Sequence, residues 1–220
     1  MSVDLRLPSG LFLRDAPKML GKKFEQWPWE NYDGVPVSDP NKIGNADIDR
    51  VYQLGARTPR DAYKQLLKER GEKIAECLCA LPTGVELEAG ESTVIALRDP
   101  LVRLFDLCLG AKHVKLAGAT KLLSPFRPAL IPVIDSVIEN YYWFATSIRN
   151  ENQFRKLQRA YKGSAWGEYV FLILQLMRDD VWSAKDQIDK VILACKGECY
   201  ASASRVRIVE SLIWFYYARG

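Results

Sequence analysis

The feature of the sequence that most limits its fold is a series of helix-length segments in which apolar residues recur every three to four positions. The clearest segment starts at Thr58-Pro59, places Ile74 and Leu78 on one face, and stops at Pro82. Threonine is a frequent N-cap, proline fits the first helical position, and a later proline ends a helix because it has no N–H group. Sustained alternation of apolar and polar residues, which would indicate strands, does not occur. We therefore predict an all-α fold.

Several other segments share this helical period and have recognisable ends. Asn45 and Asp99 are candidate N-caps, Gly71 is a candidate break, and Gly110 is a candidate stop. The predicted helices lie at about residues 46–56, 58–82, 99–110, 136–148, 153–161, 166–177, 183–195 and 202–218.

The first 45 residues have a different composition, rich in Pro, Gly, Asn and Asp, and predict loops with at most one extended segment. Trp27, Trp29 and Tyr32 are expected to fasten this segment to the body. We predict an irregular N-terminal arm over residues 1–45 and a single helical domain with two lobes over residues 46–220.

Composition and cysteine usage exclude several classes of protein. An apolar fraction of 48% is ordinary for a globular chain, and runs such as Tyr169–Leu174 are far shorter than the roughly 20 residues that span a bilayer. The N-terminus lacks the pattern of a signal peptide, so we expect a cytoplasmic protein without a membrane partner. Five cysteines, an odd number, predict reduced thiols, and their spacing predicts no metal site.

Catalytic signatures that depend on histidine or on glycine-rich loops are missing from the sequence. His113 is the single histidine, which argues against a Ser-His-Asp triad and against histidine metal sites. No glycine-rich phosphate loop is present, and we expect no cofactor.

Positive charge is concentrated in two stretches, although the net charge is only +4. Residues 112–127 carry five basic or histidine side chains and no acid, and residues 149–162 carry five basic side chains and one acid. Two such stretches would suit a polyanion such as nucleic acid. Two solvated helix faces would give the same pattern, and the sequence leaves both interpretations open.

A resemblance appears in residues 101–142, where a helix, a turn, a second helix and a link with two prolines precede Asp135. The segments "LVRLFDLCLG", "AKHVKLAG", "ATKLLSPF" and "RPALIPVIDSVIENYY" resemble the core of the helix-hairpin-helix DNA glycosylases, the superfamily of endonuclease III and adenine glycosylase. The chain is also similar, over about residues 45–217, to an uncharacterised bacterial family of domains of unknown function. The resemblance to the helix-hairpin-helix glycosylases implies a glycosylase-like bundle of about eight to ten helices.

The resemblance implies a catalytic role for Asp135, which matches the aspartate at the start of a helix in those enzymes. The same side chain is expected to cap the helix that begins at Ser136, so the two roles overlap. Ala117 stands where bifunctional members have a lysine nucleophile, which disfavours lyase chemistry unless Lys115 or Lys121 substitutes.

The remaining predicted site residues follow from the hairpin, the link and the aromatic residues. An aromatic residue near Asp135 would stack on a base, although aromatic residues at helical spacing are usually core. The predicted nucleic-acid contacts are Lys112, His113, Lys115, Gly118, Lys121 and Arg127, and the predicted pocket residues are Tyr141, Tyr142 and Arg205.

The sequence thus supports three functional hypotheses. In the first, the protein binds DNA or a nucleotide-like ligand and acts as a monofunctional N-glycosylase-like hydrolase. In the second, it is a non-catalytic module that binds nucleic acid or protein and retains the scaffold without the chemistry. In the third, it is a nucleotide- or nucleoside-modifying enzyme outside DNA repair. The sequence does not determine the oligomeric state.

Overall fold

The described part of the chain is mainly helical, with one small two-stranded hairpin, which confirms the all-α prediction. The structure is a computed structural model that describes residues 2–24, 32–33, 35–195 and 203–218. Its α-helices are α1 (Ala16–Phe24), α2 (Asn45–Gln53), α3 (Arg60–Cys79), α4 (Glu91–Ala96), α5 (Arg98–Leu109), α6 (Leu116–Leu123), α7 (Ser136–Arg149), α8 (Glu151–Lys162), α9 (Trp166–Ser183), α10 (Lys185–Ala194) and α11 (Arg205–Tyr217). The 3₁₀ helix η2 covers Ser124–Phe126 and extends α6.

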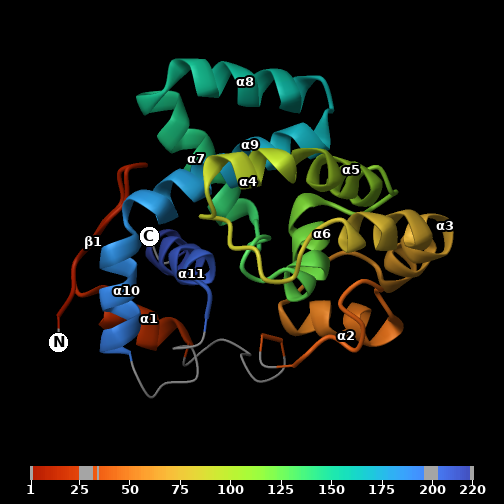
Figure 1. Cartoon of the computed structure of the whole chain (residues 1–220), viewed down its shortest axis with the longest axis horizontal. Coiled ribbons are helices and arrows are strands. Elements are labelled where there is room, and N and C mark those ends of the chain that lie inside the picture. Colours follow the sequence, from red (N-terminus) through yellow and green to blue (C-terminus); the bar gives the residue numbers. More distant parts are fainter. Residues whose placement is uncertain (1, 25–31, 34, 196–202, 219–220) are drawn as a thin grey trace.

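The helices pack around two centres (Figure 1). In one, α9 packs between α5 and α8, and α3 packs on α5. In the other, α11 contacts α1, α7, α9 and α10. Helix α6 contacts both α2 and α5, whereas Lys112, His113 and Lys115 in the turn before it are exposed.

The N-terminal arm is more regular than the sequence predicts. Strands β1 (Leu5–Arg6) and β2 (Phe12–Leu13) form an antiparallel hairpin in which Leu5 pairs with Leu13. The hairpin is followed by α1, which packs on α11, although this part was expected to be irregular. Tyr32 is buried and its hydroxyl donates to the Lys121 carbonyl over 2.7 Å, while Trp27 and Trp29 lie outside the described residues.

Most predicted helices are present, but several begin elsewhere. Helix α2 is capped by Gly44, whose N–H donates to the Asp47 carboxylate over 2.8 Å, and Asn45 is already helical. Helix α3 begins after Pro59 and continues through Gly71 without a break. Helix α5 begins at Arg98, directly after the short helix α4, which the sequence reading missed.

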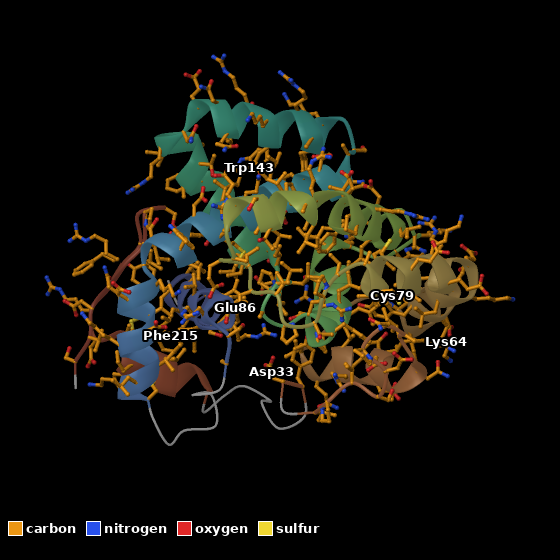
Figure 2. The ribbon with its side chains drawn as sticks, viewed as in Figure 1. Asp33, Lys64, Cys79, Glu86, Trp143 and Phe215 are labelled. Atoms are coloured by element: carbon orange, nitrogen blue, oxygen red, sulfur yellow. The ribbon has the colours of Figure 1, made fainter. Side chains whose placement is uncertain are left out.

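An aromatic cluster holds α8 onto α7 and α9, as expected for aromatic residues at helical spacing. Trp143 of α7 lies beneath α8 (Figure 2). Its ring centre is 5.2 Å from that of Phe154, 5.7 Å from Tyr161 and 6.3 Å from Tyr169. These rings therefore pack together between three helices, with Tyr169 buried and Tyr161 at the exposed edge of the cluster.

Length and polarity separate the described helices from membrane spans. Within residues 2–24, 32–33, 35–195 and 203–218, no helix is both long and apolar enough to cross a bilayer.

Candidate functional site: a groove beside Asp135

A groove of about 720 Å³ opens beside Asp135, and it is formed by segments far apart in the sequence. One side consists of the loop between α2 and α3 and the start of α6, and the other consists of the end of the proline-containing link and one face of α11. Its ionisable lining residues are Arg57, His113, Lys115, Lys121, Asp135 and Glu210. Four basic or histidine side chains thus share one cavity with two carboxylates.

Asp135 is held rigidly at the edge of this groove. Its Oδ1 atom accepts from the backbone N–H groups of Val137 and Ile138 over 2.9 and 3.2 Å, so the side chain caps α7 as predicted. Its Oδ2 atom accepts from the indole Nε1 of Trp214 over 2.8 Å. The carboxylate is therefore oriented from two directions, by its own helix and by α11.

The residues before Asp135 are anchored through buried side chains. We refer to residues 127–135 as the strap, because they connect η2 to α7 in a turn followed by an extended stretch. The Val133 N–H donates to Glu210 Oε2 over 2.9 Å, and the Ile134 N–H donates to Thr120 Oγ1 over 3.0 Å. Both acceptors are buried, so the end of the strap has little freedom.

Glu210 belongs to a buried ionic network at the base of the groove. Arg207 donates to both oxygens of Glu210 over 2.8 and 2.7 Å, and also to Asp33 over 2.9 Å. Burial raises the pKa of Glu210 to about 7, even though Arg207 favours the charged form. Burial therefore shifts the titration of this carboxyl toward neutral pH.

Lys121 brings a positive charge to the same cavity. Its Nζ donates to the Leu54 carbonyl over 2.7 Å. Burial lowers the pKa of Lys121, and the nearby Asp135 and Glu210 carboxylates act in the opposite direction.

The turn between α5 and α6 reaches the groove through its second half. His113 has a φ of 69°, a left-handed conformation that histidine adopts more often than most residues, and it lines the groove with Lys115. No side chain caps α6, whose first-turn residues Ala117 and Gly118 also line the groove. An uncapped helix start presents N–H groups that suit an anion.

Gly118 also has a packing role. A Cβ atom at this position would lie 2.5 Å from Thr58 Oγ1 and 2.7 Å from the Tyr63 hydroxyl. The glycine therefore lets α6 approach the start of α3 closely.

Two of the predicted nucleic-acid contacts lie away from the groove. Lys112 lines a separate cavity of about 240 Å³ beside Arg70. Arg127 is buried, and its guanidinium donates to the Leu78 and Leu81 carbonyls at the end of α3. The prediction for Arg127 is corrected, because its donors are directed at protein oxygens inside the fold.

The predicted pocket residues are also corrected. Tyr141 and Tyr142 are buried, and neither lines the groove. Tyr142 donates to the Asp180 carboxylate over 2.9 Å, and Tyr141 is hydrogen-bonded to Ser9 of the β1–β2 hairpin. Their hydroxyls therefore connect the N-terminal hairpin to α7 and α9.

Arg205 lies in a different cavity of about 530 Å³ and is neutralised there. It donates to Asp189 over 2.6 Å and to Glu88 over 3.0 Å. The second basic stretch is equally separate, because residues 149–162 contribute nothing to the groove lining and lie mostly on α8.

Sequence reasoning missed Arg57, Thr58 and Glu210 as groove residues and did not single out Trp214. These residues reach the groove only because α11 and the α2–α3 loop fold against α6 and the strap. Within the described ranges no three His, Cys, Asp or Glu side chains gather as metal ligands, and Cys199 lies outside them.

Comparisons with known proteins give one match. No curated protein and no solved structure matches the chain. A family model does match over residues 12–216, nearly the whole chain, and its description is "Family of unknown function (DUF6308)". That match does not connect the chain to the helix-hairpin-helix glycosylases. The chain belongs to this family of unknown function, DUF6308.

Proposed function

We propose that the groove binds a nucleotide within a nucleic acid and that the protein is a monofunctional N-glycosidic hydrolase with Asp135 as its catalytic carboxylate. The observation that carries this proposal is that Asp135, fixed by Trp214 and its own helix, shares one cavity with four basic or histidine side chains.

The basic part of the groove supplies the recognition of phosphate. Arg57, His113 and Lys115 line the cavity together with the uncapped start of α6. Side-chain cations and free helix N–H groups are the usual phosphate donors of nucleic-acid-binding proteins. A phosphate held there would bring the attached sugar toward the carboxylates.

The chemistry requires only an anion next to the sugar. As the C1′–N bond breaks, its electron pair leaves with the base and positive charge develops on the sugar ring. A carboxylate beside the ring stabilises that charge, a water molecule then adds to C1′ and releases a proton to solvent, and the departing base takes up a proton from solvent. Ala117 stands where the bifunctional helix-hairpin-helix glycosylases have a lysine nucleophile, which is consistent with this hydrolytic route.

Base release is the direct test of catalysis. Oligonucleotides that carry modified, mismatched or deaminated bases are incubated with the wild type and scored for abasic sites. Asp135→Asn should lower release at least 100-fold while circular dichroism stays unchanged. The matched control is Asp99→Asn, whose side chain is 89% exposed on α5 and should leave release unaltered. If the wild type releases no base across the panel, the catalytic proposal is wrong.

Lyase activity is a separate outcome of the same assay. If a lysine attacks the sugar, borohydride reduction during the reaction would trap the imine between C1′ and the lysine amine. Trapping that disappears in Lys115→Ala or Lys121→Ala would show that one of these amines acts as a nucleophile, contrary to the monofunctional route.

Binding is tested through its dependence on salt. Each phosphate contact that is lost lowers the slope of log affinity against log salt by about 1. Arg57→Ala and Lys115→Ala should each flatten this slope, whereas Lys156→Ala and Lys162→Ala on α8 should not. Equal effects from the two sets of variants would mean that binding is not located in the groove.

One observation favours a non-catalytic function instead. Protein donors already occupy both oxygens of Asp135, as would be needed if the residue served only to cap α7. Salt-dependent binding that survives Asp135→Asn, together with the absence of base release, would establish a nucleic-acid-binding module without chemistry.

A further inference from the structure

We infer that Trp214 is the positioning residue of the groove: its indole N–H leaves Asp135 one free acceptor position and directs that position at the ligand. The inference rests on the proposed function, since it assigns how the proposed catalytic carboxylate is aimed.

The hydrogen bonds of Asp135 lead to this assignment. A carboxylate has about four acceptor positions, two on each oxygen. On Oδ1 both positions are taken by the N–H groups of Val137 and Ile138. On Oδ2 one position is taken by Trp214. Among the described residues, no further donor to Asp135 is present, so one position on Oδ2 remains for a ligand.

The helix cap alone cannot fix where this position points. Because both cap bonds end on Oδ1, Oδ2 could still tilt about the side-chain torsion. The bond from Nε1 stops that rotation, and tryptophan suits the task because its ring nitrogen is a donor and never an acceptor. A hydroxyl or an imidazole could reverse its role, whereas this N–H always faces the carboxylate.

The position of Trp214 on α11 links this bond to the rest of the groove. Glu210 lies one turn earlier on the same helix and accepts from the Val133 N–H. Helix α11 therefore holds the strap at Val133 and at Asp135, two residues apart. Asp135, Trp214 and Lys121 all line the cavity, so the carboxylate adjoins a space that already contains a cation.

The hydrogen bond itself can be tested without any ligand. Indole N–H signals of ¹⁵N-tryptophan-labelled protein are assigned with Trp214→Phe, and exchange of the Trp214 N–H with solvent is compared between the wild type and Asp135→Ser. Serine keeps the cap of α7 but is too short to reach the indole. Exchange should be at least tenfold faster in Asp135→Ser. Equal exchange rates would overturn the positioning role.

The functional consequence is tested with two abasic-site analogues in otherwise identical oligonucleotides. One contains a pyrrolidine, whose ring amine is protonated where charge develops on the sugar, and the other contains a neutral tetrahydrofuran. Wild-type protein should prefer the cationic analogue. Trp214→Phe should reduce this preference roughly 10- to 100-fold, the usual effect of one hydrogen bond to a charged group. Its affinity for the neutral analogue should fall by a clearly smaller factor than its affinity for the cationic one.

Controls separate positioning from general damage to the fold. Trp143→Phe alters a partly buried tryptophan of the α7–α8–α9 aromatic cluster and should leave the preference intact. If Trp214→Phe weakens both analogues equally, Trp214 acts as a binding surface and the inference is wrong. If the wild type binds neither analogue, the proposed function fails, while indole exchange still decides whether Trp214 holds Asp135.

Discussion

Asp135 and Asp180 are two carboxylates beside α7 that make similar numbers of hydrogen bonds in very different surroundings. Asp180 of α9 is buried and accepts from the Ser9 N–H, the Ser9 hydroxyl and Tyr142. Asp135 accepts from two backbone N–H groups and Trp214, yet lines an open cavity. The number of hydrogen bonds does not distinguish a structural acid from a candidate catalytic one. What distinguishes them is whether an acceptor position still faces a space that a ligand can enter.

The largest expected difference is in the stability of the fold. Asp180→Ala should lower the free energy of unfolding by about 3 kcal/mol, because the Tyr142 hydroxyl and the Ser9 N–H lose their buried acceptor. Urea unfolding measures the effect. The neighbouring Asp179→Ala is the control, since that side chain is 61% exposed and should change stability by less than about 0.5 kcal/mol. Similar losses in both variants would show that the Ser9–Tyr142 network contributes little.

The second difference concerns pH and the acid that holds the strap. The pKa of Glu210 is raised from 4.5 to about 7 in the folded protein. Its contribution to stability is therefore fully present below pH 4.5 and is lost as pH rises through 7. The difference between a pKa of 4.5 and one of about 7 corresponds to roughly 3 kcal/mol of unfolding free energy for this buried group.

Glu210→Gln should remove this part of the pH dependence. The measurement is the difference in unfolding free energy between pH 5 and pH 8, obtained for the wild type and for the variant. The wild type should lose more stability than the variant as pH rises. If the two proteins respond identically, Glu210 does not titrate in this range.

The smallest expected effect is the loss of stability when Asp135 no longer caps α7. Asp135→Ala should cost about 1 kcal/mol of stability through loss of the cap of α7, and Asp135→Ser should restore most of it. Both variants should lose the proposed activity equally. A loss of stability as large as that of Asp180→Ala would place Asp135 among the structural acids.

The fold was predictable wherever local chemistry decides the backbone. A proline follows the end of α3, a glycine follows the end of α5, and Asp135 precedes the start of α7. These residues are expected there because the N–H and C=O groups at helix ends have no partners within the helix. Helix α1 was missed because the surrounding Pro, Gly, Asn and Asp residues dominate the composition, while its burial against α11 supplies the stability.

The candidate site was predictable only in part, for a physical reason. Asp135, His113, Lys115, Gly118 and Lys121 lie within a short stretch of sequence, so one local pattern brought them together and the structure places all five on the groove. Glu210 and Trp214 come from the last helix, and their roles depend on long-range packing that no local pattern contains.

The site predictions that the structure corrects concern mainly aromatic and arginine side chains. Their spacing does not reveal whether the polar end of the side chain finds a partner inside the protein. Tyr142 finds Asp180, and Arg205 finds Asp189 and Glu88. Each of these side chains is satisfied within the fold before any ligand is considered.

The buried guanidinium of Arg127 has a consequence for how the strap responds to acid. Its acceptors are the Leu78, Leu81, Pro40 and Phe126 carbonyls and the Asn41 amide oxygen, and none of these gains a proton at ordinary acidic pH. The other end of the strap is held by Glu210, which does gain a proton. Acidification therefore leaves the end of the strap at α3 unchanged and acts only on the end next to Asp135, where protonation of the buried Glu210 favours the folded state.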